Sequence, residues 1–263
     1  MQSNQANSAA IRAFRILEIL AEAKRPLSLA EIVEAIELPK PTVHRILQQL
    51  QESWLIARDV GGRHYECSSR VNQFALNLMM NSGPAAERHA ILRDLVEQIG
   101  ETCNLTTLNG TEIVYIDRVE TQWPLRVHLQ PGSTVPLHCS ATGKLLLSLL
   151  PKAKRDRLLK TLPLRPGAGA PNAITDRAAL RREIEATRKR KIGINNQENL
   201  QGIIAVAVPV MLDRNRACAS IAAQAPVARM SLDQLLGYVP ALRKAAAAIV
   251  ETFARQTKGT ASA

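Results

Sequence analysis

Residues 42–49 carry polar side chains of the types that read the bases of a nucleic acid. Four apolar residues between positions 43 and 50 follow the i, i+3, i+4, i+7 spacing of an amphipathic helix. The opposite face presents hydroxyl, imidazole, guanidinium and amide groups, which hydrogen-bond base edges and phosphates in a major groove. The residues of this polar face are Thr42, His44, Arg45, Gln48 and Gln49. On an isolated helix, a solvated polar face is the better explanation, so the neighbouring elements decide the interpretation.

The preceding residues predict a helix-turn-helix. An amphipathic helix over residues 11–23 ends before Pro26, and Ser28-Leu29-Ala30-Glu31 fits the capping box of a second helix. Residues 38–41 then form a short turn. A capped helix, a short turn and a helix with a polar face make this motif, whose last helix enters the major groove. We count Ser28 and Lys40 among the candidate DNA contacts.

Residues 55–67 predict a β-hairpin that follows this motif. Strand-like residues 55–58 and 63–67 flank a turn that contains Gly61-Gly62. A hairpin directly after a recognition helix is a wing, from which Arg58 and Arg63 can reach phosphates or the minor groove. Solvated hairpin charges are an equally good explanation of these two residues. An apolar helix over residues 69–80 follows, either as a dimer linker or packed on its own domain.

The rest of the chain alternates strands and helices, so we predict an α+β protein with a larger second domain. The expected strands are 103–108, 112–119, 125–129, 203–211 and 217–223, and the expected helices are 142–150, 155–160, 178–189 and 232–253, the last interrupted at Pro240. The expected organisation is a disordered tail 1–9, a winged helix-turn-helix 10–68, a linker helix 69–84, a second domain 85–256 and a tail 257–263.

The start of the helix expected at 142 is a candidate anion site. The segment Cys139-Ser140-Ala141-Thr142 enters this helix, where unpaired N–H groups and the positive end of the helix dipole favour an anion. A carboxylate is the natural ligand, and Gly143 would let it approach the backbone closely. The alternative is that these residues only cap the helix.

Four other groupings resemble parts of enzyme sites, but none forms a catalytic set. Gly143-Lys144 lacks the remainder of a phosphate-binding loop. The pair His138-Cys139 has no third residue to orient it, and Asp117 with Glu120 fits a charged surface strand. The basic run 188–191 fits a solvated helix end. We therefore expect no enzyme activity and no cofactor.

Composition restricts the class of protein further. The chain has 263 residues, only 3% aromatic residues and a net charge of +11. Residues 1–80 hold 9 basic and 8 acidic side chains, whereas residues 81–263 hold 25 and 15. Placed contacts, and not bulk charge, must therefore carry DNA binding. The four cysteines lie far apart, no apolar run reaches membrane-spanning length, and the polar N-terminus lacks a signal peptide, so we expect a cytoplasmic protein without a metal site.

The N-terminal motifs resemble the winged helix of the IclR family of transcriptional regulators. The resemblance rests on residues 29–32, 38–47 and 55–59. Two residues depart from the family pattern. Pro41 stands where the family usually has serine, and as a first-turn proline it costs the helix little. Trp54 stands where the family usually has glycine, so a positive φ there would be strained.

The C-terminal motifs resemble the GAF-like effector domain of the same family. They are residues 131–133 and 136–147, then 196–198, 202 and 207–210. The resemblance implies an effector-binding cavity formed by Cys139, Ser140, Ala141, Thr142, Gly143, Asn196, Glu198, Ala205, Ala222 and Gln224. Ala205 stands where a cysteine is frequent, and Ala222 and Gln224 stand where serines are frequent, which implies a different ligand shape.

The sequence thus predicts a transcriptional regulator that binds double-stranded operator DNA under the control of a small carboxylate. We expect a homodimer or a tetramer, without a membrane partner. The second hypothesis is a metabolite-binding module whose helix-turn-helix contacts another protein. The sequence leaves open the effector, the operator, and activation or repression. It argues against a doubly anionic effector, which Glu198 would repel.

Overall fold

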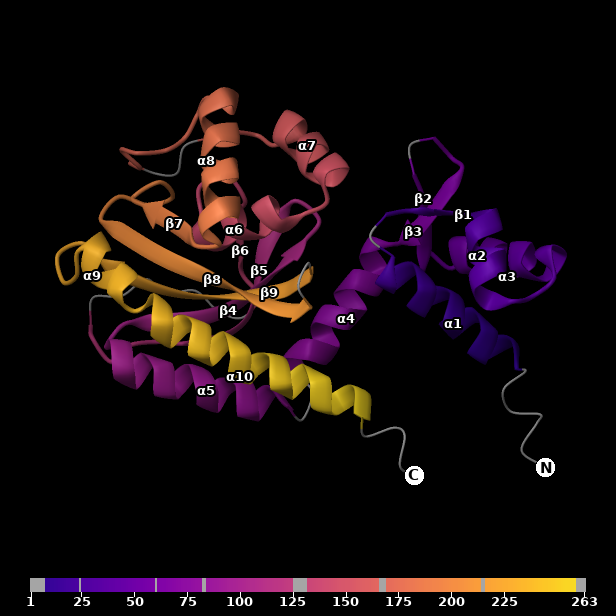
Figure 1. Ribbon diagram of the computed structural model, residues 1–263, viewed down its shortest axis with the longest axis horizontal. Helices are drawn as coiled ribbons and strands as arrows, with labels where there is room; N and C mark the ends of the chain where they lie inside the picture. The colour runs from indigo at the N-terminus through magenta and orange to yellow at the C-terminus, as the bar shows by residue number, and fades with distance from the viewer. Residues whose placement is uncertain are drawn as a thin grey trace. The chain divides into compact units, whose positions relative to one another are not determined.

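A computed structural model describes residues 8–23, 25–59, 61–81, 84–124, 132–165, 169–213 and 216–258. The described chain forms two compact units, one up to Leu78 and one from Met79 (Figure 1). Helix α4, Ser69–Asn81, contains the boundary between them. The predicted strand 125–129 lies outside the described residues, as do most of the two expected tails.

The N-terminal unit is a winged helix-turn-helix. Its elements are α1 (Ala9–Glu22), β1 (Leu27–Ser28), α2 (Leu29–Ile36), α3 (Lys40–Glu52), β2 (Ile56–Arg58) and β3 (His64–Cys67). The strands form an antiparallel sheet in the order β1-β3-β2. The predicted capping box is present, because Ser28 Oγ accepts from the Glu31 N–H and the Glu31 carboxylate accepts from the Ser28 N–H. Ile16, Ile32 and the apolar stripe of α3 form the core.

The C-terminal unit is one six-stranded antiparallel sheet covered by helices on both faces. The strands, in the order β6-β5-β4-β9-β8-β7, are β6 (Thr134–Pro136), β5 (Glu112–Val119), β4 (Thr102–Asn109), β9 (Arg216–Pro226), β8 (Ile203–Asp213) and β7 (Gly193–Asn196). The helices are α5 (Pro84–Ile99), α6 (Ala141–Leu149), α7 (Lys152–Thr161), α8 (Arg177–Arg190), α9 (Leu232–Gly237) and α10 (Val239–Lys258). Helices α5 and α10 lie side by side on one face, and α6 and α8 lie on the other (Figure 1).

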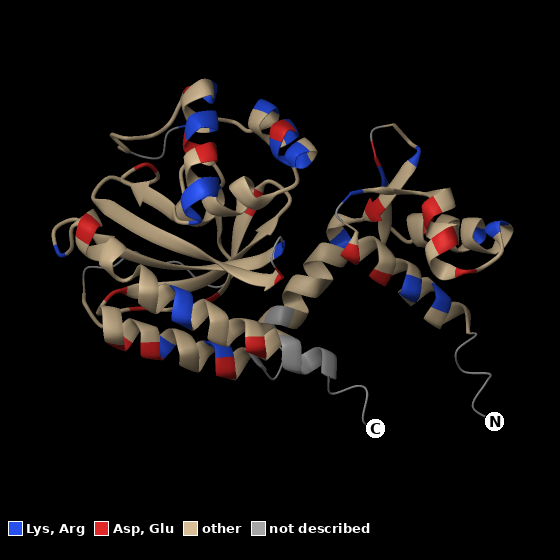
Figure 2. Cartoon of the chain, viewed as in Figure 1, with Lys and Arg blue, Asp and Glu red and all other residues tan. Residues whose placement is uncertain are grey.

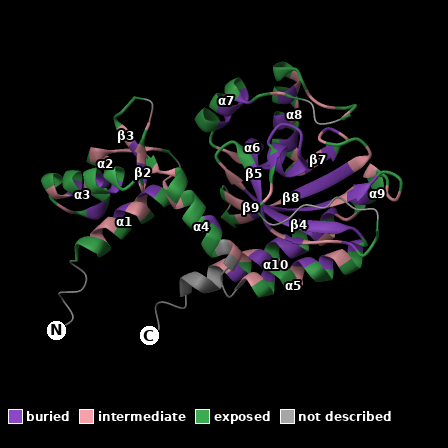
Figure 3. Ribbon diagram, turned by 180° about the vertical axis from the view of Figure 1, so that it is seen from behind, coloured by how far each residue is buried: buried purple, intermediate pink, exposed green. Residues whose placement is uncertain are grey.

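Alternation along the central strands separates two kinds of packing. Leu105, Val206 and Ile221 belong to the large core beneath α5 and α10. The residues that face α6 from β8 and β9 include Ala205, Ala207 and Ala222. Small side chains on that face let α6 approach the sheet, and all residues of α6 up to Ser148 are buried (Figure 3).

Several element boundaries differ from those expected. Helix α1 begins at Ala9, with Ser8 as its N-cap, and α10 continues to Lys258. The interruption expected at Pro240 falls just before it, between α9 and α10, because proline fits the first turn of a new helix. The short strands β1, β6 and β7 were not predicted, because two to four residues carry too little periodicity to indicate a strand.

Candidate DNA-reading face and ligand cavity

The third helix places its predicted polar face toward solvent. Its apolar stripe, Val43, Ile46, Leu47 and Leu50, is buried in the core of the unit. Thr42 is half-buried, whereas Lys40, His44, Arg45, Gln48 and Gln49 are exposed. Pro41 lies in the first turn, and the carbonyl of Pro39 accepts from the N–H groups of residues 42 and 43 at 2.9 and 3.1 Å.

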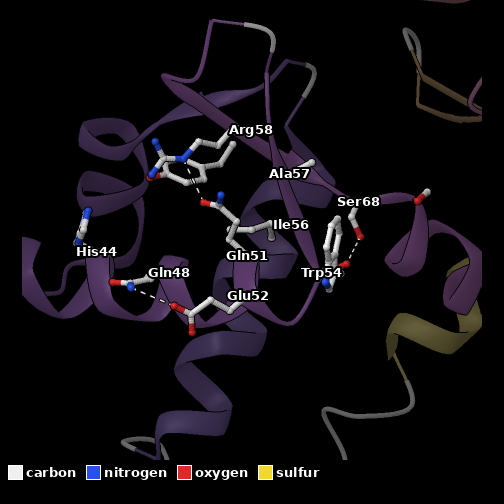
Figure 4. A pocket seen from close by; sticks show the side chains of 11 residues that line it. His44, Gln48, Gln51, Glu52, Trp54, Ile56, Ala57, Arg58 and Ser68 are labelled. Carbon is white, nitrogen blue, oxygen red and sulfur yellow. Dashed lines mark hydrogen bonds between the residues drawn. The ribbon is translucent and has the colours of Figure 1, made fainter.

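A groove of about 780 Å³ lies between α3 and strand β2 (Figure 4). It is lined by residues of α3, the wing and the start of α4: His44, Gln48, Gln51, Glu52, Trp54, Ile56, Ala57, Arg58, Tyr65, Ser68 and Ser69. Gln48 donates to the Glu52 carboxylate at 3.0 Å, so this amide is held along the helix. The groove therefore joins one edge of the polar helix face to the base of the wing.

Arg58 connects the third helix to the wing. Its guanidinium donates to Gln51 Oε1, to the Gly62 carbonyl and to the Tyr65 hydroxyl, each at 3.1 Å. The guanidinium carbon also lies 5.1 Å from the centre of the Tyr65 ring. These contacts make Arg58 a residue that positions the hairpin.

Asp59 organises the turn of the wing. Its Oδ1 accepts from the N–H groups of Arg63 and His64, both at 3.1 Å, and its Oδ2 lies 3.1 Å from His64 Nδ1. The hydrogen bond from the His64 N–H is the main reason that the pKa of Asp59 lies below its ordinary value. The fixed turn leaves Arg63 exposed. Ser28, in contrast, is engaged in its capping box.

Trp54 has the positive φ that the family's glycine would favour. Its φ is 58°, and its side chain is 76% exposed. Its N–H donates to the Gln51 carbonyl at 3.0 Å, and its own carbonyl accepts from Ser68 Oγ at 2.6 Å. The turn thus keeps a left-handed residue after α3, with a bulky side chain in place of glycine.

A cavity of about 50 Å³ lies between the start of α6 and the sheet. Its lining residues are Asn104, Tyr115, Val135, Ser140, Ala141, Thr142, Asn195, Asn199, Leu200, Ile203, Ala205, Ala222 and Gln224. Six of these are predicted site residues: Ser140, Ala141, Thr142, Ala205, Ala222 and Gln224. Four other predicted residues, Cys139, Gly143, Asn196 and Glu198, lie near the cavity in sequence but do not line it. Sequence reasoning missed the asparagines and Tyr115.

Gly143 has a packing reason to be glycine. A Cβ at this position would lie 2.5 Å from the Leu137 carbonyl oxygen. Ser140 caps the helix beside it, because Ser140 Oγ accepts from the Gly143 N–H at 3.1 Å and donates to the Pro136 carbonyl at 2.7 Å. The close approach at this glycine is therefore made by the preceding loop of the protein itself.

Glu198 belongs to a buried ion-pair network behind the cavity. Lys144 Nζ lies 2.6 Å from both Glu198 oxygens and 3.2 Å from Glu183, which also pairs with Arg190 at 2.7 Å. Burial raises the pKa of Glu198, against the opposing effect of Lys144. Burial alone would raise the pKa of Glu183 too, but Lys144 and Arg190 hold it below its ordinary value. The Glu198 charge is thus compensated within the protein.

The geometry of His138 and Cys139 does not suit nucleophilic catalysis. Burial raises the pKa of Cys139 to about 11, so its thiol stays protonated at neutral pH. Its Sγ donates to Asn199 Oδ1 at 3.3 Å, and His138 Nε2 instead faces the Arg165 carbonyl at 3.0 Å. In the other pair considered, Asp117 with Glu120, Asp117 Oδ1 lies 3.0 Å from His89 Nδ1.

Three further features bear on the class of protein. Among the described residues, no three His, Cys, Asp or Glu side chains come together as a metal site. In the same part of the chain, no helix is both long and apolar enough to cross a membrane. Basic side chains gather on α7 and α8, outside the winged helix (Figure 2).

A winged helix-turn-helix joined to an α/β unit with a cavity at a helix start defines a class of ligand-responsive transcription regulators. The chain belongs to the IclR family. Residues 9–59 match the IclR helix-turn-helix domain, and residues 82–251 match the domain described as bacterial transcriptional regulator IclR C-terminal. The chain is therefore a DNA-binding transcriptional regulator.

Similar proteins agree with this assignment. The probable transcriptional regulator SauR of Cupriavidus necator is 65% identical, over 95% of this chain and 99% of its own. The crystal structure of Thermotoga maritima IclR is 27% identical with a TM-score of 0.60, covering 91% of this chain and 96% of its own. The inducer-binding domain of PobR from Acinetobacter is 27% identical with a TM-score of 0.54, covering 60% of this chain and 92% of its own.

Proposed function

We propose that this regulator is a cytoplasmic homo-oligomer that reads operator DNA with α3 and is controlled by a small acid bound at the start of α6. On this proposal it has no enzyme activity. The observation that carries DNA reading is the division of α3 into a buried apolar stripe and an exposed polar face. The proposed domains are the winged helix 10–68, the linker helix 69–84 and the effector-binding domain 85–256.

The polar face of α3 supplies the proposed contacts to base edges and phosphates. This face carries an ammonium, a hydroxyl, an imidazole, a guanidinium and an amide group, on Lys40, Thr42, His44, Arg45 and Gln49 respectively. Such groups at the start of a recognition helix read the major groove. The remaining proposed residues are Gln48, which Glu52 holds, Arg63 at the wing, and Ser28 and Arg58, which act by positioning their elements.

Exposed apolar side chains support the proposed homo-oligomer. In the N-terminal unit, α1 exposes Ile11 and Phe14, and α4 exposes Phe74 and Leu78. Apolar side chains gathered on helix surfaces are typical of interfaces between chains. A two-fold dimer places two recognition helices on half-sites about one turn of DNA apart. Either a dimer or a tetramer satisfies this geometry.

The effector proposal rests on the cavity and on a relative. A double mutant of the inducer-binding domain of PobR was crystallised as a complex with 3-hydroxybenzoic acid. In the present chain the corresponding candidate is the cavity at the start of α6, where the helix dipole favours an anion. The proposed effector contacts are Ser140, Ala141, Thr142, Ala205, Ala222 and Gln224. Cys139, Gly143, Asn196 and Glu198 act on this site through helix capping, packing and the buried ion pair.

Replacing Arg45 with alanine tests the DNA-reading face. A base contact is worth about 1–3 kcal/mol, so Arg45→Ala should weaken binding to the promoter DNA beside its own gene by about 5- to 150-fold. Fluorescence anisotropy with labelled promoter DNA and with random DNA of equal length measures this loss. Arg15→Ala, an exposed arginine on α1, is the matched control and should bind like the wild type. Unchanged affinities of Arg45→Ala for both DNAs would contradict the proposed face.

A further inference from the structure

Helices α7 and α8 carry a large excess of basic side chains on their exposed sides. From residue 152 to residue 191 the chain has 13 Lys and Arg against 4 Asp and Glu, and Figure 2 shows the basic residues on both helices. Many of these side chains are exposed and have no acidic partner in the described part of the chain. This basic face consists of Lys152, Lys154, Arg157, Lys160, Arg182, Arg188, Lys189 and Lys191.

The acidic residues of the same segment do not neutralise the basic face, because each has another partner. The pairs are Asp156 with Arg181 at 3.3 Å, Asp176 with the Ala179 N–H at 2.6 Å, Glu183 with Arg190 at 2.7 Å, and Glu185 with Arg155 at 3.7 Å. None of these partners belongs to the basic face. The positive charge of the face is therefore available to a partner molecule.

Contacts between the two helices make the basic face one surface. The Arg177 guanidinium, at the start of α8, donates to the carbonyls of Leu159 and Leu162 at the end of α7, at 2.7 and 3.0 Å. Arg181 of α8 pairs with Asp156 of α7. These contacts hold the two backbones together, so the face presents its charges from a fixed base.

Helix electrostatics explains only part of this charge. Arg188 and Lys189 lie in the last turn of α8, where cations stabilise a helix. Lys152 and Lys154, in contrast, lie in the first turn of α7, which holds no acidic residue and whose N-cap makes no side-chain hydrogen bond. Cations at that end oppose the helix dipole. Residues that break such a local rule are expected where a function requires them.

The winged helix supplies little of the electrostatic attraction that a DNA-binding protein needs. Contacts between basic side chains and phosphates supply essentially all of the sequence-independent affinity for DNA. Residues 1–80, which include the winged helix, hold 9 basic and 8 acidic side chains. The excess positive charge of this DNA-binding regulator lies in the C-terminal unit, and the basic face is where it gathers.

We propose that the basic face of α7 and α8 binds the phosphate backbone of double-stranded DNA without regard to sequence. This second DNA contact goes beyond the proposed reading by α3, because it supplies affinity and α3 supplies specificity. Residues 152–191 contain no Phe, Tyr or Trp, so the face has no aromatic ring on which the bases of a single strand could stack. Its chemistry therefore fits a duplex backbone.

Three triple variants of the full-length protein separate the basic face from net charge. The face variant removes three exposed charges from both helices: Lys154→Gln, Arg157→Gln and Lys189→Gln. The matched control removes three exposed charges from α5 and α10, on the sheet face opposite α8: Arg93→Gln, Arg243→Gln and Lys244→Gln. The third variant keeps the charges of the face: Lys154→Arg, Arg157→Lys and Lys189→Arg. All these side chains are exposed, and thermal unfolding verifies the fold of each variant.

Fluorescence anisotropy with random and with promoter duplex DNA, between about 50 and about 200 mM salt, provides the readout. Each lost phosphate contact lowers the slope of log affinity against log salt by about 0.9, so the face variant should lose about 2–3 from the slope. Its Kd for random DNA should rise at least tenfold at the lowest salt. The ratio of promoter to random affinity should stay unchanged, because phosphate contacts carry no sequence information.

The control variant and the charge-keeping variant should both bind like the wild type. An unchanged slope in the face variant would overturn this inference and leave the proposed reading by α3 standing. An equal loss in the control variant would assign the effect to net charge and overturn the role of the face. A loss as large in the charge-keeping variant would also contradict binding through charge.

Discussion

Replacing Trp54 with glycine should stabilise the winged-helix unit. Trp54 holds a left-handed backbone conformation, with φ at 58°, at the turn after α3. In that conformation the Cβ of an L-residue crowds the following carbonyl, which costs about 1–2 kcal/mol. Glycine avoids this crowding because it has no Cβ.

The expected gain follows from three contributions. Glycine recovers the crowding cost but loses about 0.5–1 kcal/mol more conformational entropy on folding. The indole is 76% exposed, so its removal uncovers little apolar surface. The mid-range values, about 1.5 kcal/mol recovered and about 0.75 kcal/mol lost, leave a net gain of about 0.75 kcal/mol, which lowers the population of the open unit about three- to fourfold.

Hydrogen exchange measured by mass spectrometry resolves this change within the full-length protein. Peptides from α3 should exchange about three- to fourfold more slowly in Trp54→Gly, whereas peptides from α10 serve as an internal reference. Trp54→Ala separates the two causes, because it removes the ring but keeps a Cβ at positive φ. If Trp54→Ala protects α3 as much as Trp54→Gly does, backbone strain is not the cause and the reasoning is refuted.

Three further predictions test the structure of the two units. Gly143→Ala should lower the free energy of unfolding by about 1–3 kcal/mol, measured by thermal unfolding, because its Cβ meets the preceding loop; an unchanged melting temperature would contradict that packing. Lys144→Met should cost about 3–5 kcal/mol near pH 7, because it leaves the Glu198 charge buried without its main partner. This loss should shrink toward pH 5, since burial raises the pKa of Glu198 and protonation removes the charge, and adding Glu198→Leu should restore most stability in urea titrations. The hydrogen bond from Arg25 lowers the pKa of Glu31 to about 2, so the stability that its carboxylate contributes is present above pH 4.5 and is lost as the pH falls toward 2. Arg25→Ala should therefore raise the pKa of Glu31 in an NMR titration. An unchanged pKa would exclude the ion pair with Arg25 as the main cause of the low value.

The winged helix could be predicted closely from the sequence because its signals are local. The capping box at Ser28 and the buried stripe of α3 each lie within one short segment. The glycine that the family usually has at position 54 raised the possibility of a positive φ there. The φ of Trp54 is indeed positive, at 58°. Helix α6 begins at Ala141, one residue before the expected start, because Ser140 is its N-cap.

The cavity could be predicted only in part because it depends on distant pairing. Asn104 reaches the site because β4 pairs with β9, more than a hundred residues later in the chain. The sequence around Asn104 carries no sign of this pairing. Lys144 and Glu198, similarly, form an ion pair only because β7, which ends two residues before Glu198, packs against α6.

The most direct test of the central claim is the affinity for promoter DNA with and without a small carboxylate that a thermal-shift screen shows to bind the full-length protein. Anisotropy titrations of the wild type should show a change in apparent Kd when that acid is added. Gln224→Glu should bind the same DNA with the wild-type Kd and show no change with acid. An unchanged wild-type Kd, or an equal change in Gln224→Glu, would contradict control of DNA binding through this cavity.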